Sequence, residues 1–197
     1  KSSQNEFALM GYFARLSYDY AGKYLVEANM RYDGTSRFPR NHRWGFFPSL
    51  ALGWRISEEA FFEPVRPTIS NLKLRASVGS LGNQITDNSA KFNNNTFYPY
   101  MRLITLKPTT NLNYIFDNAQ AVYASLGAPT SGSLTWETIV TQNAGLDVGL
   151  FNNRLSLVLD VYSRTTKDML AAARALPAVY GYNAPYENNG ELRTNGF

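Results

Sequence analysis

The sequence contains no cysteine, little charge and no long apolar run. Without cysteine, the fold cannot rest on disulfides, and a metal site would need other ligands. Charged residues make up only 17% of the chain, and the net charge of +4 comes from scattered basic residues rather than from a stripe. Nucleic-acid binding is therefore not indicated. The absence of any run of about 18 apolar residues excludes a membrane-spanning helix.

Aromatic residues, in contrast, are plentiful at 14% of the 197 residues, and Asn, Gly, Ser and Thr are common. This length is normal for one domain. The sequence opens at Lys1 without an initiator Met or a signal peptide, and it stops at Phe197 in what reads as the entry to a further strand. We therefore expect it to be a piece of a longer chain whose targeting segment lies elsewhere.

The segment from Tyr24 to Asp33 alternates between apolar and polar residues along its whole length. Its apolar face has small and aliphatic residues in the middle and a tyrosine at each end, Tyr24 and Tyr32. A strand that crosses a bilayer has this pattern, because aromatic rings settle at the two headgroup levels. The pattern therefore predicts the wall of a membrane barrel.

Two hairpins can be paired from the sequence. A strand over residues 7–20 would be joined by Ala21–Lys23 to the strand that begins at Tyr24. This turn would pair Tyr20 with Tyr24 and Tyr12 with Tyr32. A second hairpin would turn at Asn152–Asn153, because Asn tolerates left-handed dihedrals. In both hairpins the apolar residues of the two strands then share one face, as register requires.

Two further strands are predicted between these hairpins, over residues 44–56 and 71–81. Pro48 lies inside the first of them and removes a ladder donor, which predicts a bulge or an unpaired position. Residues 57–70 begin with Ser57-Glu58-Glu59, which suits one capped helical turn.

The connections alternate between short and long. Residues 82–134 and 166–189 show no periodicity, whereas 21–23 and 152–153 are short turns. Outer-membrane barrels have this asymmetry, with short turns on one side and long extracellular loops on the other. We predict an all-β fold, an antiparallel transmembrane β-barrel segment of about six to seven strands with long extracellular loops.

Specific residues resemble the barrel signature of SusC/RagA-type TonB-dependent outer-membrane transporters. They lie at 31–38, 43–49, 53–59, 72–79, 82–83, 136–137, 142–147, 151–155, 166–168, 189–191 and 195–197. The resemblance covers nearly the whole chain outside the two long loops. It implies a roughly 22-stranded barrel with a plugged lumen.

The resemblance also implies a function and partners. The complete protein would import a glycan or peptide nutrient across the outer membrane of a Gram-negative bacterium. Its energy would come through TonB, and a SusD-like surface lipoprotein would cap it. The plug domain and the TonB-contacting segment would lie N-terminal to this piece, and the closing strands would lie C-terminal. No cofactor is implied.

Three groups of candidate site residues follow. The lumen-facing candidates are Arg15, Glu27, Asn29, Arg31, Lys73 and Arg75. The aromatic girdle candidates, which would contact lipid, are Tyr12, Tyr20, Tyr24, Tyr32, Trp44 and Trp54. The third group consists of surface-loop residues that would contact a substrate or a partner, namely Arg37, Arg40, Arg43, Phe97, Tyr98 and Tyr100.

Enzyme chemistry is not indicated. His42 is the only histidine and has no nearby metal-ligating partners. No serine stands in a nucleophile-elbow pattern. Glu58 and Glu59 are adjacent and do not face one another as a catalytic pair, and a helix-start charge preference explains them more simply. We expect no catalytic and no metal residues.

One alternative remains open at this point. A soluble β-sandwich carbohydrate-binding module from a surface protein would also explain the alternation, the tyrosines and the Asn-rich loops. It does not explain aromatic residues at both ends of the apolar faces.

Overall fold

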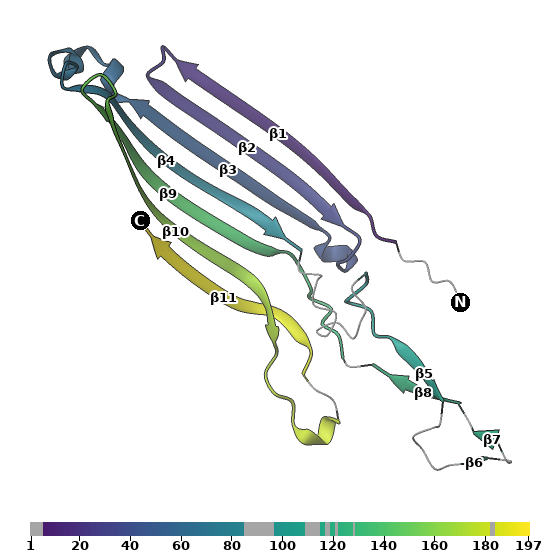
Figure 1. Ribbon diagram of the computed structural model, residues 1–197. Coiled ribbons are helices and arrows are strands. Elements are labelled where there is room, and N and C mark those ends of the chain that lie inside the picture. Colours follow the sequence, from purple (N-terminus) through teal and green to yellow (C-terminus); the bar gives the residue numbers. More distant parts are fainter. Residues whose placement is uncertain are drawn as a thin grey trace.

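The protein forms one curved, seven-stranded antiparallel sheet in the computed structural model (Figure 1). The structure describes residues 6–84, 97–108, 115–116, 119–120, 122–127, 129–181 and 184–197. The strand order is β1-β2-β3-β4-β9-β10-β11. The strands are β1 (Leu9–Tyr20), β2 (Tyr24–Thr35), β3 (Trp44–Arg55), β4 (Ile69–Asn83), β9 (Glu137–Leu150), β10 (Leu155–Ala172) and β11 (Tyr186–Gly196). No helix in the described ranges is long and apolar enough to cross a membrane.

The first hairpin has the predicted register. Tyr20 lies opposite Tyr24, and Tyr12 lies opposite Tyr32. The turn between them closes because Ala21 (φ 53°) and Gly22 (φ 67°) adopt left-handed dihedrals. The Gly22 amide donates to the Asp19 side chain at 2.7 Å, which fixes the turn further.

The second hairpin confirms the predicted register, because Leu150 lies opposite Leu155 and this register continues along β9 and β10. The turn is longer than the predicted two residues, since it spans residues 151–154. Asn152 and Asn153 have the expected positive φ angles, and Phe151 shares that conformation at 54°. Since β9 also pairs with β4, residues far apart in sequence become neighbours in the sheet.

Two predictions about irregular segments were wrong. Strand β10 continues to Ala172 and β11 already begins at Tyr186, so the irregular connection is shorter than residues 166–189. The periodicity fails there because the register shifts around Asp168, whose φ is 56°. The region 82–134 contains the short strands β5 (Ile104–Pro108), β6 (Ile115–Phe116), β7 (Ala119–Gln120) and β8 (Val122–Leu126).

The sequence between β3 and β4 differs in detail from its prediction. It forms the 3₁₀ helices η2 (Ile56–Glu58) and η3 (Ala60–Val65), and neither has a side-chain cap. Pro48 causes no bulge, because β2 and β3 stay in register past it. The pairing of β3 with β4 starts only at Ser49, so Pro48 is unpaired on its β4 side, as the prediction of an unpaired position allowed.

The two ends of the sheet differ. Short connections and the η2–η3 segment lie at one end, the short-turn end, and the long connections lie at the other, the long-loop end (Figure 1). The β5–β8 and β6–β7 ladders extend beyond the long-loop end rather than over a face of the sheet (Figure 1). In the described part of the chain, no second sheet packs on the first, which contradicts the β-sandwich alternative.

The small apolar core lies at the long-loop end. It consists of Phe38, Phe47, Leu134, Trp136 and Leu170. The Trp136 ring makes edge contacts with Phe38 and Phe47, each with ring centroids 5.6 Å apart. In the described part of the chain, the one buried hydrophobic residue outside this cluster is Phe62 between β3 and β4, because the side chains of the sheet itself are mostly half-buried or exposed within this chain.

Candidate functional site

One face of the sheet is apolar across its strands. At one level, the register aligns Tyr18, Val26, Leu52, Ala76, Ala144 and Val161 from six neighbouring strands. Most of these side chains are exposed within this chain. A soluble monomer does not leave so wide an apolar surface uncovered, so this face requires an apolar environment.

Aromatic rings gather at both ends of this apolar face. Near the short-turn end, Tyr24 stacks on Trp54 with ring centroids 6.3 Å apart, and Tyr20 lies beside Tyr24 at 6.4 Å. Near the long-loop end, Trp44 stacks on Tyr32 at 4.8 Å, and Tyr12 stacks on Trp44 at 6.2 Å. From Tyr24 to Tyr32 the strand rises about 26 Å. With the usual strand tilt, this separation suits the apolar band of a membrane barrel.

The opposite face carries charges that pair with one another. On β1 and β2, Arg15 forms an ion pair with Glu27 at 2.6 Å, and Asn29 donates to Glu27 at 2.9 Å. Further along β2, Arg31 forms an ion pair with Asp33 at 3.1 Å. Phe13 and Val158 are apolar residues on this face by register. We call this surface the polar face.

Arg75 joins three strands on the polar face. From β4 it forms ion pairs with Asp147 of β9 at 3.1 Å and with Asp160 of β10 at 2.9 Å. Gly145 of β9 lies between Arg75 and Asp160 in the register. A Cβ at this glycine would lie 2.7 Å from Asp160 Oδ1 and 2.8 Å from Arg75 Cζ. The absence of a side chain at residue 145 therefore lets the ion pair form across β9.

A hollow of about 470 Å³ opens on the polar face over β1–β4. Its lining includes the charged residues Glu27, Lys73 and Arg75, together with Ala51 and Ser77. The hollow combines charges of both signs and the hydroxyl groups of two serines with aliphatic side chains such as Leu25.

The structure thus brings the six lumen-facing candidates to one face, and five of them, all except Lys73, form short polar contacts there. Lys73 lines the hollow but forms no ion pair among the described residues. Sequence reasoning missed Asp33, Asp147 and Asp160 as partners. The register of the second hairpin places Asp160 beside Gly145, but the approach of Arg75 depends on β4 pairing with β9, which no local pattern indicates.

The loop candidates mainly contact their own chain. Arg37 lies over the Phe7 ring at 4.1 Å, and Arg43 donates to the Phe38 carbonyl at 3.1 Å. Phe97 packs near Phe7, with ring centroids 6.2 Å apart.

The remaining loop candidates also lie at the long-loop end. Tyr98 donates to the Glu6 carbonyl at 3.1 Å and makes an edge contact with Tyr100. Tyr100 packs against the apolar core, and Arg40 is exposed in the 3₁₀ helix η1 (Arg40–His42). The role of these residues in partner contact stays a prediction.

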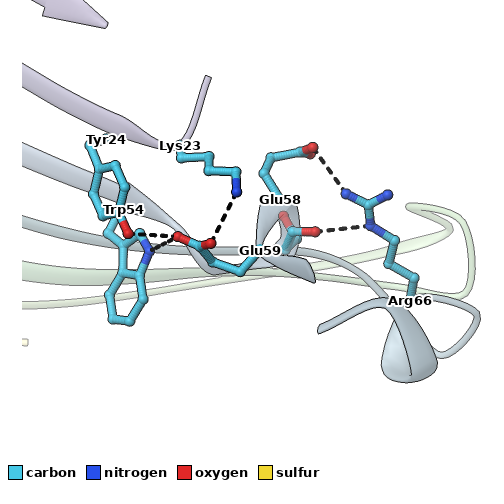
Figure 2. Close-up of polar contacts among 7 residues, drawn as sticks. Lys23, Tyr24, Trp54, Glu58, Glu59 and Arg66 are labelled. Carbon is cyan, nitrogen blue, oxygen red and sulfur yellow. Dashed lines mark hydrogen bonds and ion pairs between the residues drawn. The ribbon is translucent and has the colours of Figure 1, made fainter. Parts of the chain in front are cut away.

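Two glutamates at the short-turn end have specific partners (Figure 2). Glu59 accepts hydrogen bonds from Tyr24 at 2.7 Å and from Trp54 at 3.3 Å, and it pairs with Lys23 at 3.1 Å. The hydrogen bond from Tyr24, followed by those from Lys23 and Trp54, holds the pKa of Glu59 below its ordinary value of 4.5. Glu58 pairs with Arg66 at 3.0 Å. Both residues do lie at helix starts, since Glu58 is in the first turn of η2 and Glu59 is the N-cap residue of η3, and each has these side-chain partners in addition.

A third glutamate, Glu137, is buried at the long-loop end. It accepts hydrogen bonds from the Leu170 amide at 3.0 Å and from Asn83 at 3.2 Å. Next to it, Trp136 donates to the Arg43 carbonyl at 3.0 Å. In the described part of the chain, no three His, Cys, Asp or Glu side chains gather as metal ligands would.

The family model described as "TonB dependent receptor-like, beta-barrel" matches residues 1–197. TonB-dependent receptor SusC of Bacteroides thetaiotaomicron is 38% identical over 191 residues, which are 95% of this chain and 18% of SusC. TonB-dependent receptor P26 of Formosa agariphila is 34% identical over all 197 residues, again 18% of the relative.

Solved structures agree with these relatives. A chain of the RagAB peptide importer in its open-open state superposes with a TM-score of 0.78 at 30% identity, covering 96% of this chain and 19% of that one. The closed-closed state gives a TM-score of 0.76. The chain spans about a fifth of the length of these relatives. It belongs to the TonB-dependent receptor β-barrel family and is related to its SusC and RagA-type members.

Proposed function

We propose that this chain forms part of the wall of an outer-membrane transporter that imports a glycan or peptide nutrient. The observation that carries the proposal is the contrast between the two faces of one sheet. The apolar face ends in aromatic rings on both sides, as a lipid-facing surface does, while the polar face pairs its charges and holds a hollow. By this reading the polar face lines the lumen and the long-loop end is extracellular.

The partners belong to the same proposal. The relatives are named TonB-dependent receptors, and RagAB is named a peptide importer. We infer TonB as the source of energy, a SusD-like surface lipoprotein over the extracellular loops, and a Gram-negative outer membrane as the location. A plug domain and the closing strands would come from sequence outside these 197 residues. The role is transport rather than catalysis.

Uptake by cells tests this function. The full-length protein and its neighbouring lipoprotein would be expressed in a host that lacks its own copy, with labelled oligosaccharides and labelled peptides offered separately. We expect uptake of one of the two classes, and its loss when TonB is deleted. Uptake that is unchanged without TonB, or no uptake of either class by a correctly inserted protein, would contradict the proposal.

A further inference from the structure

The connection between β3 and β4 is fastened to the apolar face of the sheet. Glu59 reaches the polar tips of Tyr24 and Trp54, whose stacked rings belong to that face (Figure 2). The ion pair with Lys23 adds a link to the neighbouring turn. The chain therefore turns, as it leaves β3, toward the side on which the rings project.

The connection is also internally fixed. Arg66 donates to the Ser57 carbonyl at 2.9 Å. It also pairs with Glu58 (Figure 2), and the two contacts join the start and the end of the segment. Ser57 is only 2% exposed, and Phe62 is 7% exposed. The segment is thus a folded unit with its own buried side rather than a free loop.

The other side of this unit is apolar and uncovered. Phe61 is 66% exposed and Val65 is 43% exposed. Pro64 follows Phe61 by three residues, is also exposed and shares its side of the 3₁₀ helix, whereas Val65 follows Phe62 by three residues and lies on the adjacent side, still partly exposed. A large ring and two further apolar side chains at a fixed position need a partner or an apolar medium.

We propose that η3 is an interfacial anchor, with Phe61, Pro64 and Val65 inserted at the headgroup–acyl boundary of the bilayer leaflet at the short-turn end. Lipid is the expected occupant because Glu59 binds Tyr24 and Trp54, whose rings mark the membrane interface at the short-turn end, so η3 lies next to that interface. The charged groups of Lys23, Glu58 and Arg66 lie beside it, where headgroups and water can solvate them. This inference rests on the proposed membrane-spanning role of the sheet.

Spin labels on the full-length protein in phosphatidylethanolamine–phosphatidylglycerol vesicles test the anchor. Phe61→Cys carries the test label, Glu63→Cys is the matched control on the same helix, and Leu52→Cys marks the apolar face of β3. We expect collisions with oxygen to exceed those with a water-soluble nickel complex at residue 61, and more strongly at residue 52. The reverse is expected at residue 63.

The outcomes separate the two proposals. A water-exposed label at residue 61 with a lipid-exposed label at residue 52 would overturn the anchor and leave the barrel wall intact. A label at residue 61 shielded from both reagents would also overturn it, because a protein surface or a second copy would then cover η3. A water-exposed label at residue 52 would contradict the proposed function itself. In the background of Glu59→Ala, we expect the label at residue 61 to move toward water while that at residue 52 stays unchanged.

Discussion

Two adjacent lysine substitutions on β3 should differ strongly in their effect on folding. Leu50 lies on the apolar face between Trp44 and Trp54, with Ala28 and Val78 as its register neighbours. A lysine near the midplane of the lipid face of a barrel costs about 2–4 kcal/mol. This corresponds to a loss of about 30- to 700-fold in the folding equilibrium, since 1.4 kcal/mol is about tenfold.

Ala51→Lys is the matched control, because it adds the same charge one residue along the same strand. Ala51 lies on the polar face, lines the hollow and has Glu27 as its register neighbour. A lysine at this position can extend into water and pair with Glu27, so we expect a change within about 1 kcal/mol.

Urea titration of the full-length protein in phospholipid vesicles measures both free energies of unfolding. The predicted result is a large loss for Leu50→Lys and a small change for Ala51→Lys. Equal costs, or a larger cost for Ala51→Lys, would refute the assignment of the two faces.

Four smaller predictions concern single contacts. Arg75→Gln should lower the free energy of unfolding by about 1 kcal/mol through the loss of two partly exposed ion pairs, whereas Lys73→Gln should change it little in the same titration. Gly145→Ala should displace the ion pair between Arg75 and Asp160 and so lower the free energy of unfolding. This loss should be smaller in the Arg75→Gln background, and an equal loss in both backgrounds would show that the ion pair is not involved. Trp136→Phe keeps the ring contacts but loses the hydrogen bond to the Arg43 carbonyl, and should cost about 1 kcal/mol. The contacts of Glu59 lower its pKa, so Glu59 stabilises the short-turn end fully at a pH above its ordinary pKa of 4.5, and this stabilisation fades as the pH falls through the lowered pKa. The mobility of a spin label at residue 61 should therefore rise on acidification. Glu59→Gln should abolish that pH dependence.

The hairpins could be predicted from the sequence because two independent signals agree in them. Alternation with a period of two fixes which residues of β1 and β2 share a face, and the length of the turn at Ala21–Lys23 fixes the register. The same reasoning succeeded at Asn152–Asn153. It failed around Asp168, because a register shift within β10 breaks the alternation that the reasoning depends on.

The contacts that connect distant strands could not be predicted in this way. Arg75 and Asp160 are 85 residues apart, and their pairing depends on β9 lying beside β4 after a long connection. Glu59 follows β3 and Tyr24 begins β2, 35 residues apart, and no local pattern joins them. Periodicity indicates the face on which a side chain lies, whereas such partners depend on the order of strands in the sheet.

A scan of spin labels along β2 in the full-length protein, reconstituted in phospholipid vesicles, tests the central claim most directly. The collision rates with oxygen and with a water-soluble nickel complex would be measured at each residue from Tyr24 to Asp33. We predict that oxygen dominates at Val26, Ala28 and Met30 and that nickel dominates at Glu27, Asn29 and Arg31, with a strict period of two. The opposite phase, or equal exposure of both sets to nickel, would contradict a strand with one face in lipid and the other in a polar lumen.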